Sequence, residues 1–159
     1  MNETRLMMSK QIKTKQRVKE RGEVFTNPRE VKAMCDLIPL ESGVWQNIES
    51  TFLEPACGNG NFLVEIYERK LKICKNEKDG LKALNSIVGI DIMPDNVEES
   101  KARLREMYKN QYPEASEFAL LVLEAILKNN IICGDSLKIQ QEWLEKQEFQ
   151  QLNIFNTKK

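Results

Sequence analysis

The stretch Phe52–Leu63, "FLEPACGNGNFL", constrains the fold of this chain more than any other part of the sequence. A short apolar run ends at Glu54, glycines follow at Gly58 and Gly60, and apolar residues resume at Phe62. This order is typical of a strand that ends in a glycine turn and leads into a helix. Because glycine has no Cβ, the backbone at this turn can pass close to a bound molecule. The stretch therefore predicts a strand–turn–helix unit with a ligand-binding loop.

Strand and helix patterns alternate along the rest of the chain. We expect strands at 51–53, 86–90 and 130–133, and helices at 28–38, from 61, from 94 and at 114–128. The segment "KNEKDGLKALN" is expected to be an insertion, and a helical stretch near Trp143 and a fourth strand at "LNIF" are expected to follow. This alternation predicts an α/β fold with a parallel, doubly wound sheet, which binds ligands at the carboxyl ends of its strands.

The length and charge of the chain predict its domain organisation. With 159 residues, we expect a basic arm over residues 1–21 and a single domain over residues 22–159. Two interpretations of the arm are open: it contacts phosphates, or it is a solvated and partly helical segment. We favour the second. The net charge of the chain is zero, so no overall field draws it to nucleic acid.

Composition excludes several classes of function. The chain has no histidine, which excludes histidine general bases and imidazole metal sites. Its four cysteines lie far apart, and we expect them to be buried free thiols without a metal or a disulfide. No apolar run reaches the roughly 18 residues of a membrane span, and the basic N-terminus has no apolar signal core. We therefore expect a cytoplasmic location.

Acidic residues end three successive expected strands, at Glu54, Asp91 and Asp135. Glu54 would repel a pyrophosphate, and Leu63 replaces the last glycine of the dinucleotide pattern G-x-G-x-x-G. A ligand with an ammonium group and no phosphate fits better, and S-adenosylmethionine is such a ligand. Asp91 is placed to accept the ribose hydroxyls, and Asp135 to accept from the adenine amino group. Taken singly, each aspartate is more often a turn or helix-cap residue.

Four segments together resemble a known family: "RGEVFTNPREVKAMCDLIP", "FLEPACGNGNFLVEI", "IVGIDIMPDNVEESKARL" and "IICGDSL". In their order they look like the N-terminal half of the adenine-N6 DNA methyltransferases of restriction–modification systems. The type I modification subunits and the type IIG fused enzymes are the most similar. The resemblance spans Arg21 to Leu137. It implies a Rossmann-like class I S-adenosylmethionine-dependent fold, incomplete in its C-terminal half, with an N-terminal helical segment.

The resemblance also implies contacts with the cofactor. Thr26, beside Phe25, would hold the methionine carboxylate, and Ile92 would lie beside the adenine ring. The residues implied to bind S-adenosylmethionine are Phe25, Thr26, Glu54, Ala56, Gly58, Gly60, Asp91, Ile92 and Asp135. No residue of this chain is expected to be catalytic. The family's catalytic motif is a polar residue followed by Pro-Pro and an aromatic, and no Pro-Pro occurs in this sequence.

We therefore expect the cofactor-binding half of a DNA adenine-N6 methyltransferase, truncated or split, that is inactive alone and binds the cofactor weakly or not at all. DNA is its expected target by resemblance. A partner chain that supplies the missing motif and the target-recognition domain, or self-association, is expected to cover an exposed sheet edge. The main alternative is a non-catalytic remnant or decoy that binds restriction–modification subunits or DNA. A small-molecule methyltransferase is less favoured, and a nicotinamide dehydrogenase least.

Overall fold

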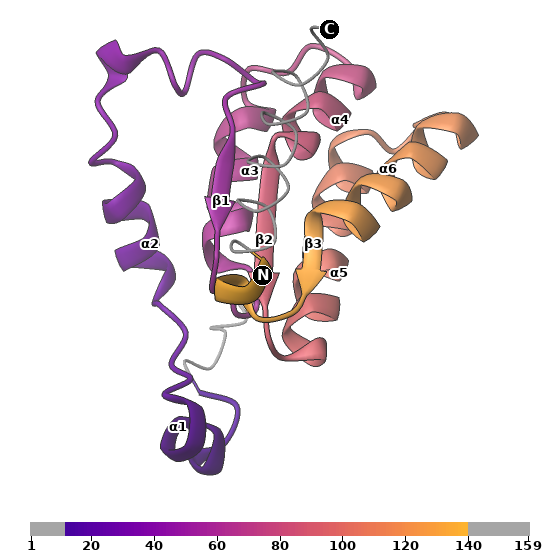
Figure 1. The fold of residues 1–159 in the computed structure, drawn as a ribbon. Coiled ribbons are helices and arrows are strands. Elements are labelled where there is room, and N and C mark those ends of the chain that lie inside the picture. Colours follow the sequence, from indigo (N-terminus) through magenta and orange to yellow (C-terminus); the bar gives the residue numbers. More distant parts are fainter. Residues whose placement is uncertain (1–11, 140–159) are drawn as a thin grey trace, which may run out of the picture.

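Three parallel strands form the sheet of this protein, shown in Figure 1 as a computed structural model that describes residues 12–139. The strands are β1 (Phe52–Glu54), β2 (Ile87–Asp91) and β3 (Ile131–Cys133), in the order β1-β2-β3. Phe52 lies beside Ile87, and Asp91 lies beside Cys133. The described part of the chain is thus a mixed α/β structure with a small parallel sheet.

Six α-helices and a short 3₁₀ helix accompany the strands within residues 12–139. They are α1 (Lys15–Arg21), α2 (Pro28–Cys35), η1 (Leu40–Ser42), α3 (Asn61–Leu71), α4 (Glu77–Asn85), α5 (Pro94–Gln111) and α6 (Glu117–Asn130). Side-chain caps explain several starts: Asn27 accepts from the amide of Arg29, and Ser116 accepts from the amide of Ala119. Proline occupies the first position of α2 and of α5, where its missing N–H removes no helical bond.

The helices between the strands pack on one face of the sheet. Both crossovers lead in the same direction, and right-handed crossovers of that kind place their helices on one face. Ile87 and Ile131 are buried under these helices, and a Cβ added at Gly89 would lie 2.7 Å from the side chain of Leu63. On the opposite face Leu53 is 55% exposed, although Ile90 is buried. The reversal of strand order that defines a doubly wound sheet does not occur among the described residues, so that detail stays a prediction.

The core lies between the sheet and the helical layer. Fully buried side chains include those of Leu63, Tyr67, Leu104, Tyr108 and Leu123. The hydroxyl of Tyr67 donates to the Gly80 carbonyl at 3.1 Å, so its polar end is satisfied inside the core. This core fixes α3 and α5 against the sheet and thereby fixes the loops at the carboxyl ends of the strands.

A buried lysine joins the opposite end of the sheet to α3. Lys70 is fully buried, and its ammonium donates to the carbonyls of Ile48 and Ser50 at 2.8 and 2.5 Å and to the hydroxyl of Ser86 at 2.6 Å. Burial lowers the pKa of Lys70 to about 8. The three acceptors come from the segments that lead into β1 and β2, so Lys70 holds the two strand starts together.

The main differences from the sequence-based elements lie at helix boundaries. The expected helix 114–128 is observed as α6, which begins later because Ser116 is its N-cap. The expected insertion forms α4, capped by Asn76, whose side chain accepts from the amide of Asp79. The helix expected at 28–38 ends at Cys35. The expected helix near Trp143 and the strand at "LNIF" lie outside the described residues.

Within residues 12–139, none of the helices combines the length and the apolarity needed to cross a membrane.

Candidate functional site

The glycine turn between β1 and α3 is held by hydrogen bonds within the turn and to the end of β2. The Glu54 carboxylate accepts from the amide of Ala56 at 3.2 Å, and the amide of Cys57 donates to the Ile90 carbonyl of β2 at 2.9 Å. Gly58 and Gly60 have φ values of 53° and 86°, in the left-handed region that favours glycine. The sequence therefore places glycine where the backbone of this turn requires it.

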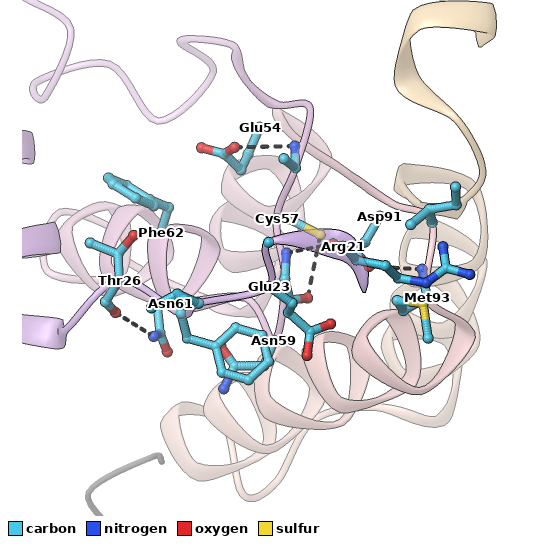
Figure 2. A pocket seen from close by; sticks show the side chains of 16 residues that line it. Arg21, Glu23, Thr26, Glu54, Cys57, Asn59, Asn61, Phe62, Asp91 and Met93 are labelled. Atoms are coloured by element: carbon cyan, nitrogen blue, oxygen red, sulfur yellow. Dashed lines mark hydrogen bonds between the residues drawn. The ribbon is translucent and has the colours of Figure 1, made fainter. Parts of the chain in front are cut away.

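A cavity of about 350 Å³ opens beside this turn, at the carboxyl ends of β1 and β2 (Figure 2). Seven of the residues expected to bind a cofactor line it: Phe25, Thr26, Glu54, Ala56, Gly58, Asp91 and Ile92. They come from three separate stretches of the chain, namely the segment before α2, the glycine turn and the end of β2. The structure thus brings together most of the residues that the sequence singled out.

Asp91 ties the end of β2 to the glycine turn. Its Oδ2 atom accepts from the amide of Gly58 at 2.9 Å, and its Oδ1 atom accepts from the amide of Met93 at 2.8 Å and from Nδ2 of Asn96 at 3.1 Å. A carboxylate has about four lone-pair sites, so these donors leave one, on Oδ2. We expected Asp91 to accept both hydroxyls of a ribose, but its bonds within the protein leave room for one.

Phe25 and Thr26 form the wall of the cavity that faces the turn. Phe25 is buried, and a Cβ added at Gly58 would lie 3.0 Å from its ring. The side chain of Asn61, the first residue of α3, donates to the Thr26 carbonyl at 2.8 Å. The guanidinium of Arg103 in turn donates to Oδ1 of Asn61 at 2.9 Å. The segment before α2 is therefore fixed to the start of α3 by consecutive hydrogen bonds of the Asn61 and Arg103 side chains.

Two of the expected residues lie elsewhere. Gly60 is the N-cap of α3 and packs against α5, since a Cβ there would lie 2.7 Å from the hydroxyl of Ser100. Asp135 follows β3, where its carboxylate accepts from the amide of Leu137 at 3.0 Å as a cap of the next helical turn. Neither lines the cavity. The assignment of Asp135 to an adenine amino group stays a prediction.

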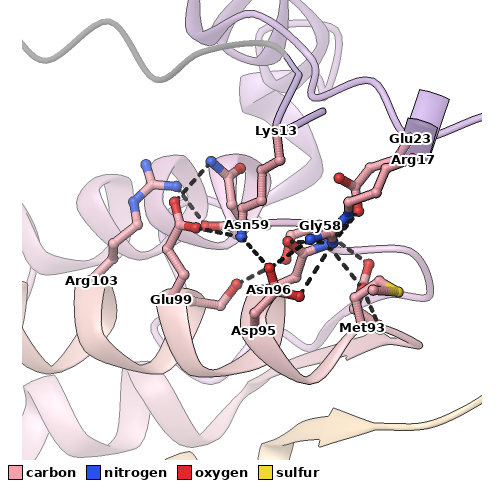
Figure 3. Close-up of polar contacts among 12 residues, drawn as sticks. Lys13, Arg17, Glu23, Gly58, Asn59, Met93, Asp95, Asn96, Glu99 and Arg103 are labelled. Atoms are coloured by element: carbon pink, nitrogen blue, oxygen red, sulfur yellow. Dashed lines mark hydrogen bonds and ion pairs between the residues drawn. The ribbon is translucent and has the colours of Figure 1, made fainter. Parts of the chain in front are cut away.

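The cavity also has lining residues that the sequence reasoning did not select, among them Arg21, Glu23, Asn59, Asn61, Phe62 and Met93. Arg21 ends the arm and Glu23 lies just after it, and α1 is held on α5 by ion pairs (Figure 3). Arg17 contacts Asp95 at 2.6 Å and Glu23 at 2.5 Å, and Lys13 contacts Glu99 at 2.9 Å. The only sequence signal for this docking was the opposite charge of the arm and the start of α5.

Cys57 lies in the cavity wall but is not a nucleophile. Burial, together with the nearby Asp91 carboxylate, raises the pKa of its thiol to about 12. The thiol is therefore protonated at neutral pH, and a thiolate is the reactive form. Among residues 12–139, no group of three or more acidic, cysteine or histidine side chains is arranged to hold a metal ion.

The lining suits a cationic ligand with apolar parts. Three carboxylates, those of Glu23, Glu54 and Asp91, border the cavity, and Arg21 is the one basic residue in its described lining. Phe62, Ile92 and Met93 supply apolar surface. Such a charge balance disfavours a polyphosphate and favours an ammonium or sulfonium group. The geometry can bind and orient a ligand of that kind.

Comparison with known proteins gives one informative match. The chain is 34% identical over 90 residues to the type II methyltransferase M.VspI of Vibrio sp. (strain 343). The match covers 56% of this chain and 18% of that protein, so the chain spans less than a fifth of the length of its relative. No family model matches the chain, and no solved structure gives a significant match.

The similarity is thus to one part of a protein named as a methyltransferase. A mixed α/β structure with a small parallel sheet is consistent with a methyltransferase-like fold. A methyltransferase requires a methyl donor, which is typically S-adenosylmethionine.

Proposed function

We propose that this chain is the S-adenosylmethionine-binding part of an adenine-N6-specific DNA methyltransferase of a restriction–modification system. The observation that carries the proposal is the cavity that the glycine turn, Glu54 and Asp91 line together at the carboxyl ends of β1 and β2. The partial similarity to a type II methyltransferase supports the methyltransferase part of this proposal.

The proposed roles follow from the charges around the cavity. Glu54 attracts the ammonium of the methionine part, and Asp91 accepts from a ribose hydroxyl. Thr26 takes the methionine carboxylate, and Ile92 packs beside the adenine ring, as the family resemblance implies. When bound, S-adenosylmethionine would supply an electrophilic methyl group on its sulfonium, with S-adenosylhomocysteine as the leaving group. The protein's contribution at this site is to hold the donor in one orientation.

We further propose that the chain alone does not transfer methyl groups. Its sequence contains no Pro-Pro-aromatic motif to hold a flipped adenine. A partner chain that carries the motif would complete the site, and either that chain or a second copy would cover the face of the sheet on which Leu53 is 55% exposed. DNA is then a ligand of the complete assembly.

A protein-detected NMR titration with S-adenosylmethionine tests the proposal, because it registers even millimolar affinities. We expect shifts of the amide signals of Gly58, Ile92 and Met93, with saturation, and none with ATP. Glu54→Gln is expected to weaken binding about tenfold, since it removes a charge-assisted hydrogen bond.

Glu49→Gln serves as the matched control, since Glu49 is exposed and lies before β1, outside the cavity. It should bind like the wild type. Absence of saturable shifts at millimolar S-adenosylmethionine would refute cofactor binding. Methyl transfer to duplex DNA by the purified chain would refute the proposed inactivity.

A further inference from the structure

Glu23 carries a buried carboxylate oxygen that no described residue satisfies. The Glu23 side chain is nine-tenths buried, with 10% of its surface exposed, and it lines the cavity. Its Oε2 atom accepts from Arg17 at 2.5 Å and from Nδ2 of Asn96 at 3.0 Å. Its Oε1 atom is shielded from solvent and has no hydrogen-bond partner among residues 12–139. A buried acceptor left without a donor destabilises a fold, so Oε1 is available to a donor. Nε of Arg17 is likewise buried without a partner among the described residues, and a ligand in the cavity is the other source of a donor.

The same amide nitrogen joins Glu23 to Asp91. Nδ2 of Asn96, a residue that is 1% exposed, donates to Oε2 of Glu23 at 3.0 Å and to Oδ1 of Asp91 at 3.1 Å. The two carboxylates are therefore held side by side at one end of the cavity. The charge of Glu23 is balanced by Arg17, so two neighbouring carboxylates are tolerated there.

Each of the two carboxylates has an oxygen with acceptor capacity left for a ligand. Asp91 has one lone-pair site left, on Oδ2, after its bonds to Gly58, Met93 and Asn96. No donor from the described part of the chain reaches Oε1 of Glu23. The terminal torsion of a glutamate is broad, so a small rotation turns Oε1 toward a ligand while Oε2 keeps Arg17. Together they offer acceptors for two adjacent hydroxyl donors.

We propose that Glu23 is a ligand-binding residue that recognises a vicinal diol jointly with Asp91, each carboxylate accepting from one hydroxyl. This inference rests on the proposed cofactor site and assigns the two hydroxyls of its ribose to two different carboxylates. Asn59 also lines the cavity and has a buried acceptor that receives no donor within residues 12–139, but its amide nitrogen is bonded to Glu99 and not to Asp91. Arg17 and Asn96 are positioning residues, because they contact Glu23 and not the ligand.

The test compares ligands that have and lack the diol. Affinities of S-adenosylhomocysteine and of its 2′,3′-dideoxy form are measured by NMR for the wild type, Glu23→Gln and Glu20→Gln. Glu20 lies on α1 outside the cavity and is bonded to Gln16, so it is the matched control. We expect Glu23→Gln to weaken binding of S-adenosylhomocysteine about tenfold and binding of the dideoxy form less than about twofold. Glu20→Gln should change neither.

Equal weakening of both ligands would overturn the proposal, because it would mean that Glu23 only supports the fold of the cavity. No effect of Glu23→Gln on either ligand would overturn it too. Adenosine and 2′,3′-dideoxyadenosine separate this result from a failure of the proposed function. If adenosine shifts the signals of Glu23 and Asn96 and S-adenosylmethionine does not, the diol site stands and the cofactor assignment falls. If neither adenosine nor S-adenosylhomocysteine shifts these signals at millimolar concentration, the diol site is refuted.

Discussion

Glycine is required at the two positions of the turn, Gly58 and Gly60, for different physical reasons. From the sequence, Gly58 and Gly60 looked alike, as positions where the backbone approaches a ligand. In the structure Gly58 faces the cavity and the Phe25 ring, whereas Gly60 packs against Ser100 of α5. The sequence could predict that the turn needs glycine, because spacing and composition report local backbone geometry. It could not predict which element would lie against each glycine, because that depends on a residue far along the chain.

Gly60→Ala should be severely destabilising. A non-glycine residue at a φ of 86° is strained by about 1–2 kcal/mol, and its Cβ would also meet the hydroxyl of Ser100 at 2.7 Å. We expect a loss of about 3 kcal/mol in the free energy of unfolding, measured by urea denaturation. Gly43→Ala is the control, since Gly43 has a φ of 75° and nothing within 4 Å. It should cost about 1 kcal/mol. Equal costs for the two variants would show that the contact with Ser100 contributes nothing.

Lys70→Met should also lower stability, even though it replaces a buried charge with an apolar side chain of similar length. With a pKa of about 8, Lys70 keeps its proton at neutral pH, and its three acceptors would lose their donor. We expect a loss of about 3 kcal/mol by urea denaturation at pH 7. The control Lys72→Met removes an exposed lysine paired with Glu68 and should cost less than about 0.5 kcal/mol. A Lys70→Met protein as stable as the wild type would mean that water replaces the lost donor.

At the scale of elements, helices with a clear cap and an apolar period were predicted well. The charged segments were predicted poorly. The cap at Asn27 gave the start of α2, whose end was placed three residues too late, and the apolar run of β2 gave that strand to within one residue. The insertion before β2 was not predicted as a helix, although Asn76 and Asp79 form a capping pair at the start of α4. The arm was expected to be solvated, yet Lys13 and Arg17 are paired with acids of α5. The charge of a segment alone does not show which residues it pairs with, because a basic segment that is solvated and one that docks on an acidic helix have the same composition.

Docking of α1 on α5 should depend on pH through Asp95. The hydrogen bonds from Arg17, and then those from Lys13, hold the pKa of Asp95 well below its ordinary value of 3.8. Because the folded pKa is depressed, this stabilisation is present above about pH 4 and is lost as the pH falls toward the folded pKa. At pH 7 we expect Asp95→Asn to be about 1 kcal/mol less stable than the wild type, a modest value because Asp95 is half exposed.

The pH series is measured as urea midpoints of the wild type and Asp95→Asn between pH 7 and pH 2. The difference between them should narrow steadily below pH 4. Glu41→Gln, at an exposed position on η1, is the control and should track the wild type at every pH. A difference that stays constant down to pH 2 would contradict an ionic contribution from Asp95.

At the scale of the whole molecule, the cavity is assembled from segments that the sequence keeps far apart. The bonds from Gly58 to Asp91 and from Asn61 to Thr26 span 33 and 35 residues, and the bond from Asn96 to Glu23 spans 73. The first was predictable in outline, since the carboxyl ends of adjacent parallel strands share one edge. The last was not, because no periodicity or motif links Glu23 to Asn96. Orphaned acceptors such as Oε1 of Glu23 become visible only when the partners are placed in space.

The parts of this molecule should therefore differ in local stability. No residue of α1 is buried, and the arm is held mainly by ion pairs, whereas β2 lies in the core between two strands. Ion pairs weaken with salt, since the screening length falls from about 10 Å at 0.1 M to about 3 Å at 1 M. Apolar packing does not weaken in this way. We expect native-state hydrogen exchange to show about fivefold lower protection of the Val18 and Gly22 amides at 1 M NaCl, with no loss for the β2 amides.

The amides of Val18 and Gly22 report on α1 because they donate to the carbonyls of Thr14 and Val18 within that helix. Lys13→Gln removes the contacts to Asp95 and Glu99. In this variant the protection of the Val18 and Gly22 amides at 0.1 M NaCl should fall to near the wild-type value at 1 M NaCl. The buried pair of Arg17 and Glu23 is screened less, so part of the protection should persist. Salt-independent protection of α1, or an equal loss in β2, would mean that the arm opens only with the whole domain. Glu23 would then be fixed in the cavity as firmly as Asp91.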